Sequence, residues 1–233
     1  MNETAFRKSS SENIERSIRS IKNTRNSNRK LYLVFKRTID ILGATIGLVL
    51  TSPIFMLIGI LYLFGDNKGP VFFAHNRIGE NGKTIKIFKF RSMIVNAEKV
   101  LKSDEVLYKK YIENSYKLEP EEDPRITKIG RFLRKTSLDE LPQLINVLKG
   151  DMSLVGPRPV ILDELKEYEA RLAEFLSVKP GLTGYWQICG RSDVGYPERA
   201  ELEFYYIDHQ GFKLDIEILL KTVLLVILRK GAY

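Results

Sequence analysis

A long apolar segment interrupted by a proline constrains the fold of this chain more than any other feature. The segment from Ile41 to Phe64 contains no charged residue, and Pro53 stands near its middle. As one straight helix it would be about 36 Å long, and a hydrocarbon core is about 30 Å thick. One helix that crosses a membrane is therefore the simplest interpretation.

The sequence Ser52-Pro53 favours a second interpretation of the same segment. Proline removes one helical hydrogen bond and clashes with the preceding turn, whereas Ser and Thr hydroxyls can satisfy the carbonyls that it frees. Two halves of about 18 Å each are too short to span alone, so the chain would enter and leave by the same face. From the residues alone, a spanning helix and a re-entrant helix–break–helix both remain open.

The positive charge of the chain is concentrated before this segment. The formal net charge is +8, and residues 1–37 contribute +7 of it, from ten Lys or Arg against three Glu. Such clusters lie on the cytoplasmic side and are attracted to anionic membrane lipid. We expect a flexible basic tail over residues 1–35 and no nucleic-acid partner, because the folded part lacks a basic face. Cys189 is the only cysteine, which excludes an intrachain disulfide.

The remaining sequence predicts a mostly helical α/β domain with a small sheet. Two strand-like runs around a glycine-containing turn indicate a hairpin, and apolar spacing indicates helices after it. A final apolar run of moderate length is typical of a helix that lies in the membrane interface. The expected strands are 70–74 and 84–90, and the expected helices are a pair within 93–117, then 139–148, 161–178 and 214–228.

An adjacent pair of acids, Asp139-Glu140, lies close to several cations. Helix capping can explain the pair: Ser137 and Glu140 have the spacing of a capping box, or Asp139 is itself the N-cap. A functional role does not compete with capping, since a helix N-terminus beside cations also binds phosphate. The pair therefore indicates either a helix cap or a site for phosphate and a divalent cation. The nearby cations are Arg131, Arg134 and Lys135.

Further cations stand at positions that surface exposure explains poorly. Lys89 and Arg91 alternate onto one face of a strand-like run, and Arg158 is fixed between two prolines. Arg125 follows Asp-Pro. Each alone is typical of a salt bridge or an exposed charge. Together with the acid pair they predict a site for a diphosphate substrate and a metal ion.

Four stretches carry a resemblance to a known family. They read KRTIDILGATIGLVLTSPIF, GPVFFAHNRIGENGKTIKIFKFRSM, DPRITKIGRFLRKTSLDELPQLINVLKGDMSLVGPRP and KPGLTGYWQICGR. In this order they resemble the bacterial sugar transferases, the monotopic polyprenyl-phosphate phosphoglycosyl transferases that initiate exopolysaccharide, capsule and glycan synthesis. The similarity runs from about Lys36 to Tyr233.

The resemblance implies transfer of a sugar-1-phosphate from a UDP-sugar to undecaprenyl phosphate, with release of UMP and with Mg²⁺ as cofactor. It implies that Asp139 is the nucleophile of a ping-pong reaction and that Glu140, with Asp139, holds the metal. Ser52 and Pro53 match the break of a re-entrant membrane helix over residues 36–65. The residues that match phosphate-binding positions are Lys89, Arg91, Arg125, Arg134 and Arg158.

The expected organisation is thus a basic tail, a re-entrant helix, and a catalytic domain over residues 66–233 on the cytoplasmic face of the cell membrane. Its partners would be the UDP-sugar, undecaprenyl phosphate and membrane lipid, and a homo-oligomer is compatible with the sequence. The sequence leaves the sugar open. Two other hypotheses are a catalytically silent membrane scaffold and a one-step transferase without a covalent intermediate.

Overall fold

The computed structural model describes residues 27–64, 67–114, 118, 122–190 and 194–228. Most of the expected basic tail lies outside the described residues. The helices are α2 (Ser27–Leu61), α3 (Ala97–Ser103), α4 (Glu105–Glu113), α5 (Lys128–Lys135), α6 (Gln143–Lys149), α7 (Leu172–Phe175), α8 (Tyr185–Cys189), α9 (Glu198–His209) and α10 (Phe212–Ile227).

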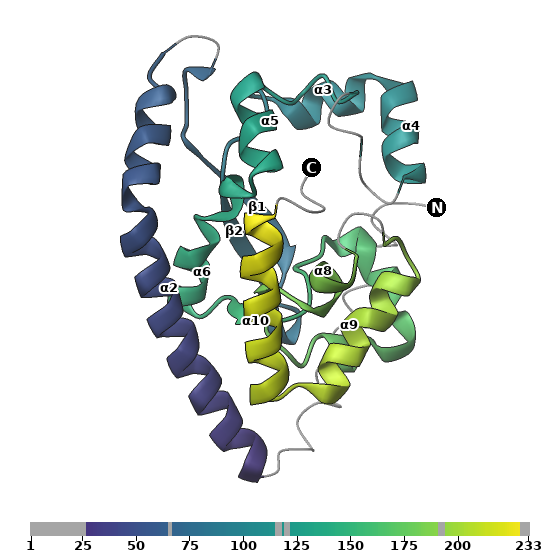
Figure 1. The fold of residues 1–233 in the computed structure, drawn as a ribbon. Coiled ribbons are helices and arrows are strands. Elements are labelled where there is room, and N and C mark those ends of the chain that lie inside the picture. The colour runs from purple at the N-terminus through teal and green to yellow at the C-terminus, as the bar shows by residue number, and fades with distance from the viewer. Residues whose placement is uncertain (1–26, 65–66, 115–117, 119–121, 191–193, 229–233) are drawn as a thin grey trace.

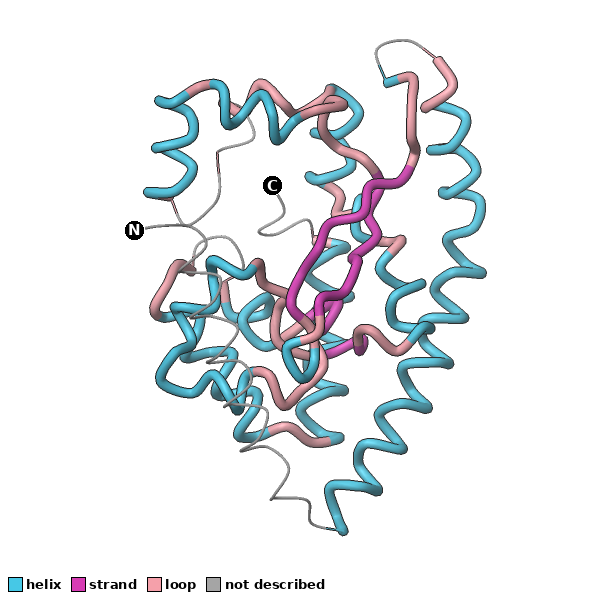
Figure 2. The backbone as a smooth tube through the Cα atoms, turned by 180° about the vertical axis from the view of Figure 1, so that it is seen from behind, coloured by secondary structure: helices cyan, strands magenta, loops and turns pink. Residues whose placement is uncertain are grey.

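In the described part of the chain, three 3₁₀-helices and four strands accompany these helices, and this part is mostly helical with little sheet, as predicted. The 3₁₀-helices are η2 (Glu80–Gly82), η3 (Leu138–Glu140) and η4 (Leu162–Arg171). Strands β1 (Phe72–Ile78) and β2 (Thr84–Phe90) form an antiparallel hairpin, and β3 (Ser153–Val155) and β4 (Gly181–Thr183) form a parallel pair. Figure 2 shows the hairpin running through the middle of the molecule.

The apolar segment forms one continuous helix, α2, which begins at Ser27 and so before the expected boundary at residue 36. The predicted interruption at Ser52-Pro53 is not found: the helix continues through Pro53 and bends in its middle (Figure 1). Proline cannot donate to the carbonyl of Val49, but the Ser52 hydroxyl donates to that oxygen at 2.8 Å. This substitute bond explains why the helix survives the proline.

Helix α2 packs against the folded body near both of its ends. Near its start, Lys36 pairs with Asp215 of α10 at 2.8 Å, and Arg37 donates to the carbonyls of Val147 and Leu148 at the end of α6. Near its end, Ile58 and Tyr62 are buried against β2 and α5. Among the described residues, the stretch Arg29–Leu61 is the one helix long and apolar enough to cross a membrane.

Three apolar clusters make up the core. One joins α2, β2 and α6 and includes Ala44 and Val147, both fully buried. A second lies where the end of α2 meets β2 and α5. The third and largest lies among η4, α7, α9 and α10. The hairpin and α6 are therefore fixed between the long helix and the carboxyl-terminal half of the chain.

The region expected to be an amphipathic helix over 161–178 is largely the 3₁₀-helix η4. Its acidic residue Glu164 is buried, with 2% of its surface exposed, and accepts a hydrogen bond from the backbone N–H of Ile161. Helix α10 forms over nearly the residues expected for the final apolar helix, and it exposes an apolar row that includes Leu220, Val223 and Leu224.

Candidate active site

The two acids lie in η3, a single 3₁₀ turn between α5 and α6. Neither capping interpretation is correct. Ser137 has a left-handed backbone and makes no side-chain cap, and α6 begins after Pro142 without a side-chain cap. Since the turn separates the acids from the start of α6, their side chains are available for other contacts. Asp139 is buried, with 7% of its surface exposed, while the side chain of Glu140 is 40% exposed.

Lys89 of β2 joins the two acids from the opposite side of the site. Its ammonium nitrogen lies 2.5 Å from Oε1 of Glu140 and 3.9 Å from Oδ2 of Asp139. The acids and the lysine are far apart in sequence, and α6 brings them together by packing against β2. Asn146 of α6 fixes that packing, since it accepts from the N–H of Phe88 and donates to the carbonyl of Lys86.

The two carboxyl groups differ in their affinity for a proton. Burial raises the pKa of Asp139 to about 6, and the neighbouring Glu140 contributes to the rise while Lys89 opposes it. Burial also acts to raise the pKa of Glu140, but the charge and hydrogen bond of Lys89, with Arg158, outweigh it and hold that pKa below its ordinary value. Lys89 therefore stabilises ionised Glu140 more than ionised Asp139.

Arg134 approaches the acids from α5. Its Nε donates to the hydroxyl of Ser92 at 2.9 Å, and its charge lowers the pKa of Asp139. Helix α5 lies close to the strand end that carries Ser92, because Gly130 has no side chain: a Cβ there would lie 1.8 Å from the carbonyl oxygen of Ser92. Arg131 and Lys135, on the same helix, are exposed.

Two of the predicted phosphate-binding residues are engaged by the protein itself. The guanidinium of Arg91 donates to the backbone carbonyls of Asn67, Pro70 and Met93. The guanidinium of Arg125 is bidentate on Asp123, with both distances 2.7 Å. The expectation that Lys89 and Arg91 share one face as one site is not met, because β2 ends at Phe90 and the two side chains reach different partners.

Arg158 lies on the other side of the acid pair, next to a buried charged cluster. Its guanidinium is 5.9 Å from the ring centre of Trp186, and its charge lowers the pKa of both Glu140 and Glu164. Its backbone N–H donates to Glu203 at 3.2 Å. The structure thus gathers the acid pair with Lys89, Arg134 and Arg158, and it leaves Arg91 and Arg125 at the edge, bound to other groups.

The donor set suits a hard divalent cation that is shared with a phosphate ligand. Among the residues that the structure describes, no group of three or more His, Cys, Asp or Glu side chains could hold a metal ion. Mg²⁺ does not need such a group, since it keeps several waters and uses one or two carboxylates plus substrate phosphates. Asp139 and Glu140 already face one shared cation, the ammonium of Lys89. The residues present therefore fit Mg²⁺.

Sequence reasoning missed two residues that fix the site. Gln143 is buried and hydrogen-bonds Glu140, and Ser92 receives Arg134. The spacing of three from Glu140 to Gln143 could have suggested the first contact, since such residues are neighbours in a helix. Nothing in the sequence around Ser92 indicates the second, which depends on the approach of α5.

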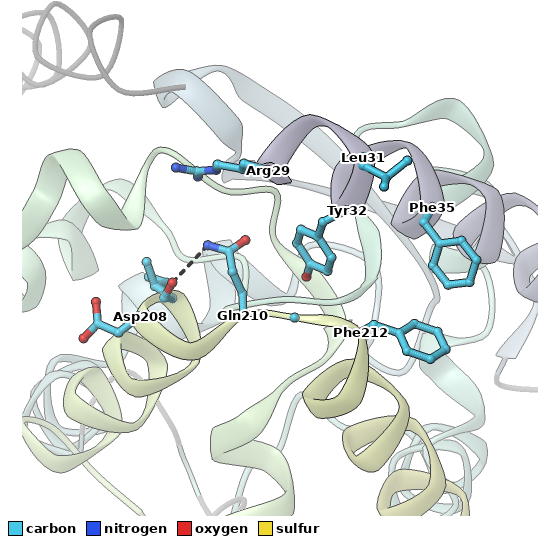
Figure 3. Close-up of a pocket in the computed structure, with 9 residues that line it drawn as sticks. Arg29, Leu31, Tyr32, Phe35, Asp208, Gln210 and Phe212 are labelled. Carbon is cyan, nitrogen blue, oxygen red and sulfur yellow. Dashed lines mark hydrogen bonds between the residues drawn. The ribbon is translucent and has the colours of Figure 1, made fainter. Parts of the chain in front are cut away.

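A cavity of about 740 Å³ lies away from the acid pair, between the start of α2 and the corner that joins α9 to α10 (Figure 3). Figure 3 shows Tyr32 and Gln210 facing each other across it, with Phe35 and Phe212 at one end. No acid or cation of the candidate site lines this cavity. We therefore place the candidate chemistry at the acid pair, where the charged groups converge.

Comparison with known proteins identifies the family of the chain. The family described as "Bacterial sugar transferase" matches residues 31–229. The undecaprenyl-phosphate galactose phosphotransferase of Salmonella typhimurium is 46% identical over 201 residues, covering 85% of this chain and 41% of that protein. The exopolysaccharide production protein ExoY of Sinorhizobium fredii is 44% identical over 204 residues, covering 86% of this chain and 88% of that protein.

A third relative is the UDP-glucose:undecaprenyl-phosphate glucose-1-phosphate transferase of Escherichia coli, 40% identical over 208 residues. That alignment covers 86% of this chain and 42% of the relative. The chain therefore spans about two fifths of the length of the Salmonella and Escherichia proteins. The matched region includes α2, the hairpin, the acid pair and α10. With nearly all of its described residues inside the match, this chain belongs to the bacterial sugar transferase family.

Proposed function

We propose that the protein transfers a hexose-1-phosphate from a UDP-sugar to undecaprenyl phosphate, through a covalent intermediate on Asp139. The observation that carries the proposal is the convergence of two acids of unequal proton affinity with Lys89, Arg134 and Arg158. The names of the relatives support the substrate class, since they include a galactose and a glucose transferase that act with undecaprenyl phosphate.

In the first half-reaction, a carboxylate oxygen of Asp139 attacks the β-phosphorus of the UDP-sugar. The bond from that phosphorus to the bridging oxygen breaks, and UMP leaves with the electron pair. In the second, a phosphate oxygen of the lipid attacks the same phosphorus and releases the Asp139 carboxylate, which yields undecaprenyl-diphosphate-sugar. A pKa of about 6 leaves Asp139 ionised at neutral pH and therefore able to attack.

The cations of the site would lower the barrier to bringing a carboxylate to an anionic diphosphate. Lys89 would contact the transferred phosphate, and Arg134 and Arg158 would approach the substrate from the two flanks. Arg91 and Arg125 would not contact the substrate. They would support the site by fixing the end of β2 and the loop before α5. Glu140, with Asp139, would hold Mg²⁺, which when bound offsets negative charge on the phosphates.

We also propose that α2 enters and leaves the membrane by its cytoplasmic face. A straight helix of this length is about 52 Å long, more than a bilayer needs. Both ends of α2 contact the same folded body, through Lys36 at one end and Tyr62 at the other. A helix that crossed the bilayer could not keep both contacts, because its ends would lie on opposite sides. Exposed apolar residues on α2 and α10 would face lipid.

The decisive experiment for the chemistry is Asp139→Asn, assayed for UMP release from a panel of UDP-sugars with undecaprenyl phosphate. We expect the variant to lose both turnover and the covalent phosphosugar adduct, which radiolabelled donor traps on the wild type. Turnover retained by Asp139→Asn would disprove the assignment of the nucleophile. Wild-type turnover without any trapped adduct would favour the one-step mechanism, and no turnover with any donor would favour the silent scaffold.

The topology has its own test. In a Cys189→Ser background, one thiol is introduced at the amino terminus and, in a second protein, one thiol is restored at position 189, which is exposed. We expect a membrane-impermeant reagent applied from outside to label neither in intact cells and both after permeabilisation. Labelling of the amino-terminal thiol in intact cells would instead show that α2 crosses the membrane.

A further inference from the structure

Arg77 stands on the same face of the hairpin as Lys89 and was not among the residues indicated by the sequence. In the register of the hairpin, Phe73 pairs with Lys89, and Arg77 pairs with Ile85. Paired and alternate residues share a face, so Lys89 and Arg77 both project from it. Phe73 and Arg77 are four positions apart on the strand, about 13 Å along the backbone. The side chains of Lys89 and Arg77 are both long, so their charged ends can approach adjacent phosphates of one diphosphate from two sides.

The environment of Arg77 is rich in positive charge. Arg77 pairs with Glu164 at 3.3 Å, but Glu164 also faces Arg199, at 3.9 Å. Arg199 in turn lies 3.6 Å from Glu203. Three guanidinium groups, of Arg77, Arg158 and Arg199, are therefore gathered around two carboxylates.

The buried part of this cluster has ion pairs but lacks some hydrogen-bond partners. Arg199 is 1% exposed, and its Nε and Nη2 have no hydrogen-bond partner. Burial, together with the nearby charge of Arg158, lowers the pKa of Arg77 to about 10. Like charges of this kind are held together at a cost, which an anionic ligand between them would offset.

Arg77 and Arg158 are the members of the cluster that a ligand can reach. The side chain of Arg77 is 18% exposed and Arg158 is half-buried, whereas Arg199 and its two carboxylates are enclosed. Arg158 acts on Glu140 on one side and on Arg77 on the other. The two guanidiniums therefore form an anion-binding pair that begins beside the acid pair and continues away from it.

The position of Arg77 and Arg158 along the hairpin indicates whether they would bind the lipid phosphate or the nucleotide phosphate. At the Phe72 end, the hairpin packs on α2 through Phe55 and Phe90, which is an apolar contact with the membrane helix. At the Arg77 end, it packs on the carboxyl-terminal half of the chain through Ile78. A lipid phosphate would arrive from the α2 end, so the Arg77 end is left for the soluble substrate.

We propose that Arg77 is a further substrate-binding residue, which acts with Arg158 to bind the phosphate group that leaves as part of the nucleotide. The inference rests on the proposed donor class, since it needs a nucleoside diphosphate sugar whose inner phosphate departs. Two guanidiniums give planar donors that match the oxygens of a departing phosphate.

The test is the affinity of the full-length protein in nanodiscs for UMP and for uridine, measured by calorimetric titration. Loss of the phosphate contact should weaken UMP binding about ten- to a hundredfold in Arg77→Gln and leave uridine binding unchanged. Arg77→Lys, which keeps the ion pair with Glu164, should recover part of the UMP affinity. Arg171→Gln is the matched control, because it removes one exposed arginine that is paired with Glu174 and Asp208.

Three outcomes would overturn the inference. If the ratio of UMP affinity to uridine affinity is the same in the wild type and in Arg77→Gln, Arg77 does not bind the phosphate. That result would not contradict the proposed donor class. A raised KM for undecaprenyl phosphate with unchanged UMP affinity would assign Arg77 to the lipid phosphate instead. A wild-type protein that binds neither UMP nor UDP would show that the proposed donor class itself is wrong. A melting curve of each variant identifies any that fails to fold.

Discussion

Removing the carboxylate of Asp139 should make the protein more stable while it abolishes the proposed chemistry. The group is buried, and burial raises its pKa from 3.8 to about 6. Because each tenfold change in proton affinity corresponds to about 1.4 kcal/mol, ionising this side chain in the folded protein costs about 3 kcal/mol relative to the unfolded chain. Asp139→Asn keeps the shape of the side chain and removes that cost.

The sign of the effect depends on pH. Below about pH 4 the carboxyl group is protonated in both states and contributes no cost. Between about 4 and 6 the folded protein holds a proton that the unfolded chain has released, so the wild-type free energy of unfolding falls as pH rises. Above about 6 both states are ionised and the full cost is present. The variant should therefore exceed the wild type by about 3 kcal/mol at pH 8 and match it at about pH 3.

The assay is urea unfolding in nanodiscs at several pH values, followed by the fluorescence of Trp186, the only tryptophan. Glu140→Gln is the control with the opposite sign, because Lys89 and Arg158 hold the pKa of Glu140 below its ordinary value and its ionised form is stabilising. Added Mg²⁺ should reduce the difference in free energy of unfolding between the wild type and Asp139→Asn. If Asp139→Asn is no more stable than the wild type at pH 8, the argument from burial is refuted.

Three further predictions concern the frame of the site and its pH dependence. Gly130→Ala should abolish activity and lower the melting temperature, because its Cβ would lie 1.8 Å from the carbonyl oxygen of Ser92, whereas Gly59→Ala, with nothing within 4 Å, should leave both nearly unchanged. Arg37→Ala should lower the free energy of unfolding by about 2 to 4 kcal/mol, measured by urea unfolding, because it removes two charged hydrogen bonds to the end of α6; an unchanged midpoint would contradict this. At low Mg²⁺ the rate of UMP release should fall as pH drops through about 6, where Asp139 gains its proton, and a profile that stays flat to pH 5 under that condition would contradict the raised pKa of this carboxyl group.

The sequence predicted those elements whose signals are local. Strand β2 occupies the predicted residues Thr84–Phe90, because its alternation and the preceding turn are encoded in one short stretch. Gly150 ends α6 in the left-handed conformation, with φ of 85°, as a glycine after an apolar run predicts. The apolar run of α10 was recognised for the same reason.

Features that depend on tertiary contacts were not predicted. The parallel pair of β3 and β4 consists of three-residue strands, which are too short to show a pattern. The burial of Glu164 and Glu203 was not predicted, because it depends on arginines that come from β1 and α9. The local pattern of Ser137 and Asp139 favours a cap on α6, but the acids lie in a separate 3₁₀ turn, and their partner Lys89 comes from β2, far away in the sequence.

The contact of Arg37 with the end of α6 has a mechanical consequence. Helix α6 is a rigid rod of about 10 Å, and its carboxyl-terminal end is tied to α2 while its other end follows directly from the acid pair. Gly47 of α2 also lies against Leu144, so the rod can neither slide nor roll on the long helix. In the proposed membrane arrangement, the height of the acid pair above the lipid would be set by how deeply α2 is seated. Helix α6 would then hold the Asp139 carboxylate at one level relative to the lipid surface.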